Sequence, residues 1–236
     1  MTTPRIELSG DQCLIVEFGS TIDVTTNRLA CAFARRLEAA ALPGVLDIVP
    51  SFTAVGVHYR ASAVQREGGE APHAAMRRAV EALLAAPLQG DGGPTRLVEI
   101  PVCYDPEFGL DLDDVAAAKG LNVDEIVRLH GATTGRVFMI GFAPGHPFIG
   151  LWDEMLAVPR RSTPRTKVPA GSVAIANRQG NVYPFELPGG WNVIGRTPLR
   201  MFDAQHQSPA LLRAGDDVRF VRISRAEFDA MQGAPR

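Results

Sequence analysis

Residues 141–203 decide the fold, and they have the sequence GFAPGHPFIGLWDEMLAVPRRSTPRTKVPAGSVAIANRQGNVYPFELPGGWNVIGRTPLRMFD. Eight of the chain's 23 glycines and eight of its 18 prolines fall within this stretch, among short apolar runs. Proline removes a helical hydrogen bond and glycine carries a backbone entropy cost, so no long helix fits here. The pattern predicts short strands that are joined by tight, rigid turns.

The flanking residues extend this β-rich pattern into a domain that covers residues 95–236. Short helices are expected at about 113–120 and 122–131, and Ser224 with Glu227 forms a capping box for a last short helix. Pro101 marks the first strand as an edge strand. Many short strands with few helices predict a closed or nearly closed β-barrel. The strands are expected at residues 96–104, 136–140, 172–176, 191–194, 199–202 and 217–223.

A small α/β domain is predicted over residues 1–90. Its pattern is strand, helix, two strands and helix, which is typical of a split βαβ sandwich with the helices on one face of an antiparallel sheet. The glycine-rich sequence QGDGGPT at residues 89–95 then predicts a linker, so the fold class is α+β, mainly β. The expected elements are 12–18, 23–41 with Asp23 as the cap, 45–49, 54–59 and 73–86.

Composition excludes several classes of partner. The formal net charge of -2 and the lack of a helix-turn-helix or zinc-finger pattern argue against nucleic acid. No apolar run approaches the roughly 20 residues of a membrane span, and the N-terminus lacks the features of a leader peptide. Cys13, Cys31 and Cys103 are odd in number and far apart, so we expect buried reduced thiols and a cytoplasmic protein.

Familiar cofactor motifs are also missing. The five histidines are scattered, none with a second His or Cys within one helical turn, so no metal site is expected. Neither Lys119 nor Lys167 stands in a Gly-Lys-Ser or Gly-Lys-Thr phosphate loop, so any use of ATP requires another kind of site.

The basic segment 159–173 is the first candidate for ligand binding. Arg160, Arg161, Arg165 and Lys167 lie within eight positions, between Pro159, Pro164 and Pro169. Prolines restrict the backbone, so a guanidinium held there can bind a carboxylate or phosphate at a lower ordering cost. The alternative is a solvated basic loop. Arg165 is the foremost candidate for an anion contact.

The second candidate segment covers residues 183–203. Arg196 follows Gly195 and precedes Thr197-Pro198, so we expect it at a strand end, either binding an anion or paired with Glu186 or Asp203. Tyr183 and Glu186 are candidate catalytic groups, which could present a hydroxyl and a carboxylate to a pocket or bond loop backbone instead.

Gly145, His146 and Ser172 complete the set of candidate binding residues. The small residues of GFAPG (141–145) allow close approach of backbone N–H groups to a ligand, and equally a tight bend. For His146 a packing or surface role is favoured over catalysis. For Ser172 a turn or strand-start hydroxyl is favoured over a nucleophile.

Four motifs resemble those of the 5-oxoprolinase B subunits of bacteria: GFAPGHPFIG, PRRSTPRTKVPAGSVAIA, YPFELPGGW and IGRTPLRMFD. VPSFTAVGVHY (49–59) and GDDVRFVRIS (215–224) extend the resemblance over nearly the whole chain. The family is also labelled allophanate hydrolase subunit 1. It includes a Bacillus inhibitor of a sporulation histidine kinase and is similar to part of the carboxyltransferase region of urea carboxylase.

The resemblance implies a cyclophilin-like β-barrel after a small α/β domain. It also implies a heteromer with the sister C protein and the A protein of 5-oxoprolinase, in which ATP drives the opening of 5-oxoproline to glutamate. Two alternatives follow from the same family: a component of an allophanate hydrolase or carboxyltransferase, and a regulator that inhibits a sensor histidine kinase. The chain has no Met-Lys pair for biotin attachment, so any biotin would be carried by another protein.

Several positions depart from the family pattern. His146 and Phe148 stand where Phe and then Tyr are usual, and Gly135 replaces an expected tyrosine. Asn177-Arg178 and Gly180-Asn181 replace a glycine-rich turn and a Thr-Gly pair. These changes are expected to surround the pocket.

Overall fold

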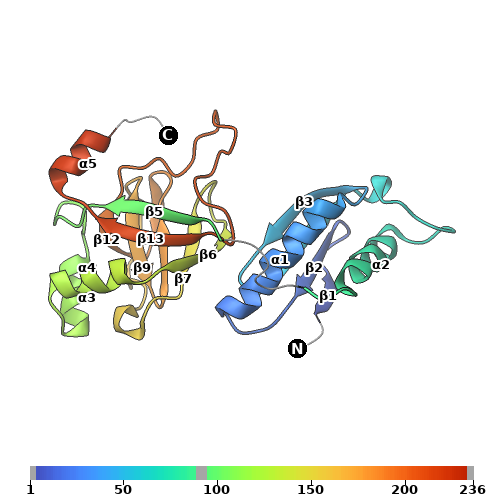
Figure 1. The fold of residues 1–236 in the computed structure, drawn as a ribbon, viewed down its shortest axis with the longest axis horizontal. Coiled ribbons are helices and arrows are strands. Elements are labelled where there is room, and N and C mark those ends of the chain that lie inside the picture. Colours follow the sequence, from blue (N-terminus) through green and yellow to red (C-terminus); the bar gives the residue numbers. More distant parts are fainter. Residues whose placement is uncertain (1–3, 89–94, 233–236) are drawn as a thin grey trace. The chain divides into compact units, whose positions relative to one another are not determined.

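The computed structural model describes residues 4–88 and 95–232, in two compact units, Met1–Pro94 and Thr95–Arg236. Figure 1 labels helices and strands in both units. Each unit has a hydrophobic core of its own. The linker predicted at residues 89–95 falls, apart from Thr95, outside the described residues.

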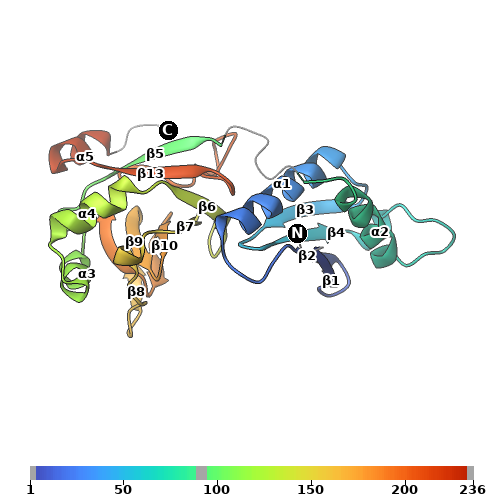
Figure 2. The ribbon, with the colours of Figure 1, turned by 60° about the horizontal axis from the view of Figure 1, so that its bottom comes forward.

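The first unit is a four-stranded antiparallel sheet in the order β1-β2-β4-β3, with α1 and α2 on one face (Figure 2). This confirms the predicted sandwich; β1 was not predicted. Its elements are β1 (Arg5–Leu8), β2 (Cys13–Glu17), α1 (Val24–Ala40), β3 (Val45–Pro50), β4 (Ala54–Tyr59), the 3-10 turn η1 (Ala61–Ala63) and α2 (Pro72–Leu84).

Local sequence explains how this unit forms. Asp23 caps α1 by accepting a hydrogen bond from the backbone N–H of Thr26 at 2.8 Å, as predicted. Leu14 and Val16 alternate along β2 toward the helices, and they pack with Phe33 and Leu37 of α1.

The second unit is built on a seven-stranded sheet in the order β12-β9-β10-β7-β6-β13-β5. β5 and β13 lie side by side and parallel, although they are far apart in the sequence (Figure 1). The elements are β5 (Leu97–Val102), α3 (Leu112–Lys119), α4 (Val123–Ala132), β6 (Gly135–Ile140), β7 (Pro147–Gly150), η2 (Glu154–Leu156), β8 (Arg165–Val168), β9 (Ser172–Ala176), β10 (Gln179–Val182), β11 (Leu187–Gly189), β12 (Asn192–Arg196), β13 (Asp217–Arg222) and α5 (Arg225–Met231).

A two-way backbone bridge nearly closes the sheet into a barrel. Cys103, just after β5, and Arg196, the last residue of β12, exchange N–H···O bonds of 2.9 Å in both directions. The prediction of a nearly closed barrel is therefore confirmed, and Pro101 lies in an end strand of the sheet. The core of the unit also takes in α3 and α4.

The predicted strand at 199–202 is wrong. Phe202 makes only an isolated bridge with Ala210, and no strand covers residues 199–202. Pro198 follows β12 closely, and the Thr197 hydroxyl accepts the Leu199 N–H at 3.2 Å, so the chain turns instead of continuing the ladder.

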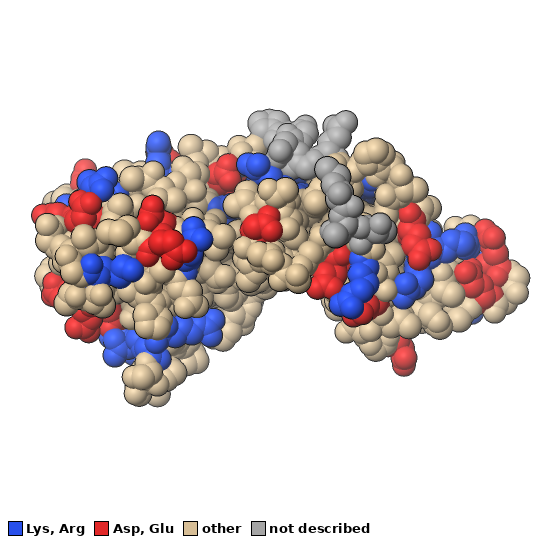
Figure 3. Space-filling view, turned by 90° about the horizontal axis from the view of Figure 1, so that it is seen from below, with Lys and Arg blue, Asp and Glu red and all other residues tan. Residues whose placement is uncertain are grey.

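Charges of both signs are interspersed on the face drawn in Figure 3, which fits the near-neutral net charge. Among the described residues, no helix is both long and apolar enough to cross a bilayer.

Candidate functional site

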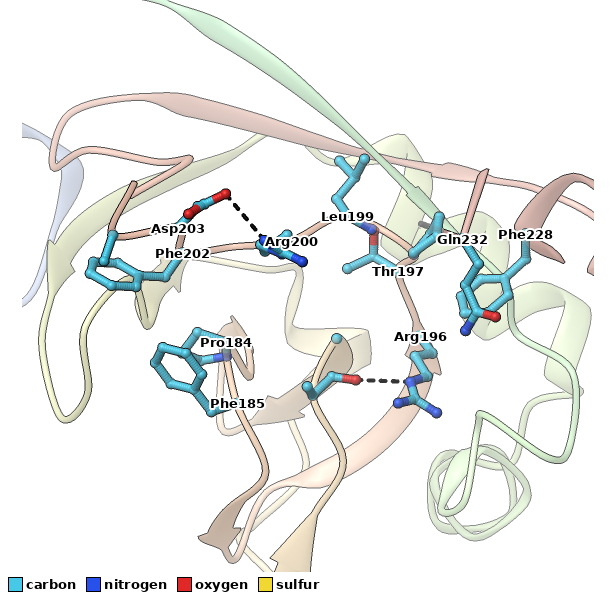
Figure 4. Close-up of a pocket in the computed structure, with 14 residues that line it drawn as sticks. Pro184, Phe185, Arg196, Thr197, Leu199, Arg200, Phe202, Asp203, Phe228 and Gln232 are labelled. Carbon is cyan, nitrogen blue, oxygen red and sulfur yellow. Dashed lines mark hydrogen bonds and ion pairs between the residues drawn. The ribbon is translucent and has the colours of Figure 1, made fainter. Parts of the chain in front are cut away.

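A cavity of about 490 Å³ lies in the second unit, at the end of β12. Most of its wall is apolar, which is usual for small-molecule sites of this size. Figure 4 shows Phe185 and Phe202 on one side and Phe228, Gln232 and Arg196 on the other. These residues come from the segment before β11, the end of β12 and the segment after it, and α5 with its C-cap Gln232.

Two arginines line the cavity, and their surroundings differ. Arg200 pairs with Asp203 at 3.2 Å, and its side chain is 70% exposed. Arg196 donates from Nε to the carbonyl oxygen of Ala170 at 2.8 Å. Within the described part of the chain, its two Nη atoms make no hydrogen bond and no ion pair. Arg196 is therefore the cation here that can accept an anionic partner.

Two glycines allow the cavity wall to close. Gly171 has φ +78°, and a Cβ there would lie 2.5 Å from the carbonyl oxygen of Thr197. Gly145 has φ +75°, and a Cβ there would lie 2.8 Å from the Cβ of Phe202. Both positions combine left-handed backbone with close approach, so glycine is needed at each. Gly145 thus supports the wall through Phe202 and does not line the cavity.

Arg161 and Arg165 lie elsewhere, bound to Asp111. Arg165 holds this carboxylate through two hydrogen bonds of 2.7 and 2.8 Å, and Arg161 bonds it as well. The backbone N–H of Val193 donates to the same carboxylate at 2.7 Å. Asp111 is only 1% exposed. The ion-pairing positions of Arg161 and Arg165 are thus occupied from within the chain, whereas Arg160 lies over the Trp191 ring, 5.6 Å from its centroid.

Lys167 and Glu186 pair with each other at 3.0 Å, and both side chains are largely exposed. Lys167 belongs to β8, which pairs with β11 in a two-stranded ribbon, and Glu186 directly precedes β11. The structure therefore brings Lys167 and Glu186 together and does not bring Arg196 to Glu186.

His146 and Tyr183 are buried side chains in an aromatic cluster whose Phe142 is exposed. Their rings meet edge to face with centroids 5.4 Å apart. The ring centroids of Phe142 and Phe148 lie 5.3 and 5.2 Å from that of His146. Burial lowers the pKa of His146 to about 4 and is the main cause that raises the pKa of Tyr183. The imidazole Nδ1 has no partner among the described residues. Neither side chain lines the cavity, whereas Pro184 and Phe185, which follow Tyr183 in the chain, do.

Ser172 is the first residue of β9 and is buried. Its carbonyl accepts the Tyr183 N–H at 2.9 Å, so its backbone connects β9 to the strand end that carries Tyr183. The preceding residues Ala170 and Gly171 line the cavity, and Ser172 does not.

Sequence reasoning missed Asp111 and the aromatic wall. Phe185 and Phe202 stand inside the quoted motifs, but their local pattern does not distinguish a cavity wall from a core. Phe228 comes from the last helix and carried no signal. The signal for Asp111 was indirect, because a cluster of arginines needs counter-charge.

No group of three or more His, Cys, Asp or Glu side chains in residues 4–88 and 95–232 could hold a metal ion. The cavity presents the guanidinium of Arg196 in a mostly apolar wall, which suits a small molecule with one negative charge and an apolar body.

Known proteins agree with this architecture. The sequence model of the carboxyltransferase domain, subdomains C and D, matches residues 4–212. The 5-oxoprolinase B subunit of Bacillus subtilis is 42% identical over 96% of this chain and 95% of its own length. The 5-oxoprolinase B subunit of Escherichia coli O157:H7 is 35% identical over 94% of this chain and 97% of its own length.

A solved structure extends the comparison. The crystal structure of TTHA0988 superposes on 90% of this chain with a TM-score of 0.78 and 35% identity. The present chain spans 40% of that longer chain. The chain therefore belongs to the carboxyltransferase subdomain C and D family, within the group that contains the 5-oxoprolinase B subunits.

Proposed function

We propose that this chain is the B component of a cytoplasmic, heteromeric, ATP-dependent amidohydrolase that converts 5-oxoproline to glutamate. Identity to proteins named as 5-oxoprolinase B subunits over nearly the full chain supports the assignment. Three buried cysteines that form no disulfide within residues 4–88 and 95–232 support the cytoplasm as the compartment.

The cavity at Arg196 is the single observation that carries the substrate class. 5-Oxoproline has one carboxylate and a small ring with two methylene groups. The free Nη atoms of Arg196 suit the carboxylate, and Phe185, Phe202 and Phe228 suit the ring carbons. Arg200 is compensated by Asp203, so one net positive charge meets one negative charge.

The reaction itself needs more than this chain supplies. The lactam amide is stable, and transfer of a phosphoryl group from ATP to its oxygen makes the ring carbon open to attack by water. The sequence has no Gly-Lys-Ser or Gly-Lys-Thr loop, so any ATP site on this chain is of another kind, and ATP is assigned to the complex as a whole. Tyr183 and Glu186 do not line this cavity, so they would orient the amide only in a site that a partner protein completes.

The test uses the chain assembled with its A and C partner proteins, with ATP-dependent release of glutamate as the readout. Arg196→Met is expected to lower kcat/KM for 5-oxoproline by about 10- to 100-fold, since a charge-assisted hydrogen bond is lost. Arg222→Met is the matched control, because Arg222 pairs with exposed Asp124 on the surface. Undiminished activity of Arg196→Met, or full activity from the isolated chain, would refute the proposal.

A carboxyltransferase component is the second candidate, because the matching family is described as a carboxyltransferase domain. The chain would then act on a carboxylated biotin carried by another protein. Carboxyl transfer from free carboxybiotin without ATP-dependent glutamate release would favour this candidate over the first.

A further inference from the structure

The ring of Phe108 lies against two arginines. The guanidinium carbon of Arg225 is 4.8 Å from the ring centroid and that of Arg196 is 5.8 Å from it. Phe108 is 7% exposed and also packs on Phe228 of α5, with the ring centroids 4.5 Å apart. A buried aromatic ring thus touches both the cavity arginine and a residue of the cavity wall.

Arg196 has few other contacts that orient its side chain. Its backbone is fixed by the bridge to Cys103, and its Nε donates to Ala170. One hydrogen bond at Nε still allows the plane of the guanidinium to rotate. A ring face near the guanidinium restricts that rotation through the attraction between a cation and the ring quadrupole.

Phe108 is itself held firmly. Its backbone N–H donates to the backbone carbonyl oxygen of Asp105 at 2.8 Å. A Cβ at Gly109 would lie 2.8 Å from the carbonyl oxygen of Ile194. The loop therefore packs directly on β12. Arg225 is bound in turn by Glu107 and Asp229, so it stays on the ring and does not compete for an anion in the cavity.

We propose that Phe108 is a positioning residue: its ring holds the Arg196 guanidinium in the orientation that binds the substrate carboxylate. The inference rests on the proposed function of Arg196. Arg196 contacts the carboxylate before and during the reaction, so loss of its orientation weakens binding of substrate and transition state alike. Phe108 therefore acts on KM and leaves kcat unchanged.

Simple packing is the competing explanation, because Phe108 shares a small apolar cluster with Cys103, Phe228 and Ile223. Ring fluorination separates the two. One, two and three fluorines withdraw electron density from the ring face step by step and change its size little. In the assembled enzyme, the series at Phe108 is expected to raise KM for 5-oxoproline stepwise, by about 3- to 10-fold in total.

The same series at Phe33 is the matched control. Phe33 is fully buried in the core of the first unit and contacts Phe18. KM should not change there, and the thermal midpoints of both series should stay close to the parent. In the full chain alone, the NMR signal of the Arg196 Nε–H should move with each fluorine at Phe108, which reports the contact independently of activity.

Three outcomes decide the matter. A stepwise rise in KM with constant kcat, confined to Phe108, supports the inference. If KM does not change along the fluorine series at Phe108, or if the Arg196 Nε–H NMR signal does not move, the role of Phe108 is overturned. The effect of Arg196→Met then still supports the proposed function. If Arg196→Met leaves KM unchanged, the proposed function of the cavity fails and this inference fails with it.

Discussion

Asp111 determines which arginines of this chain remain free. Its buried carboxylate binds Arg161 and Arg165 and also accepts the Val193 N–H. Removal of a carboxylate from water is costly, and three donors offset that cost. The proline-rich segment is consequently attached to β12 and to the start of α3, and Arg196 is left as the anion-binding candidate.

Replacement of Asp111 should therefore destabilise the fold. Asp111→Asn keeps the size of the side chain but leaves two guanidiniums without a counter-charge. Because both arginines are partly exposed, we expect the free energy of unfolding to fall by about 3 kcal/mol, the lower end of the range for broken buried ion pairs. Urea unfolding measures it. Asp124→Asn is the control, and an equal loss in both variants would contradict the role of Asp111.

Trp152 explains why glycine stands at positions 135 and 180. A Cβ at Gly135 would lie 2.5 Å from its ring, and one at Gly180 would lie 2.7 Å from its Nε1. Trp152 is fully buried, and its ring packs on His130 and Phe220. The indole thus occupies the barrel interior, and the two glycines make room for it.

At the scale of elements, α5 is a short helix that completes the cavity. Ser224 and Glu227 form its capping box, as the sequence predicted. Phe228 and Gln232 extend from this helix to the cavity wall. A helix of this length has little stability of its own, so its cap and the packing of Phe228 keep it in place.

Removal of the cap should loosen α5 selectively. Ser224→Ala is expected to weaken the helix by about 1 kcal/mol, which corresponds to roughly fivefold faster hydrogen exchange at its amides. Exchange in β9 and β12 should stay unchanged. Ser162→Ala, at an exposed position, is the control. Equally faster hydrogen exchange throughout the second unit would show that the cap stabilises the whole unit and not α5 in particular.

At the scale of the whole molecule, two buried histidines make stability depend on pH. Burial lowers the pKa of His130 to about 3 and that of His146 to about 4, from an ordinary value of 6.5. The unfolded chain takes up these protons as the pH falls below about 6.5, whereas the folded chain does not. Their contribution is therefore fully present above that pH and is lost as the pH falls toward each folded-state pKa, about 4 for His146 and about 3 for His130.

Unfolding in urea at pH 7.5 and 5.5 tests this. Between pH 7.5 and pH 5.5, each histidine should lower the free energy of unfolding by about 1.4 kcal/mol, and the two together by about 3 kcal/mol. His146→Phe removes the titrating imidazole, keeps an aromatic ring in the cluster, and should remove about half of the loss. A variant with the parent's full pH dependence would show that His146 is not held neutral in the fold.

Local patterns were sufficient for most helices and for several strands. Asp23 and Ser224 are caps whose partners lie three residues away, so nearby residues alone specify them. β8 and β11 were missed because Arg165, Lys167 and Pro188 look like loop residues. Their strand pairing depends on partners about 20 residues apart, which a local pattern cannot reveal.

The sequence by itself determined the class of each unit, the caps, and the family, because these depend on spacing within one segment or on motifs in a given order. Only the tertiary structure decided which cation is free. Arg165 and Arg196 look alike along the chain, but Asp111 lies 54 residues from the first, and Ala170 and Phe108 approach the second. An ion pair depends on distance in space, and folding alone sets that distance.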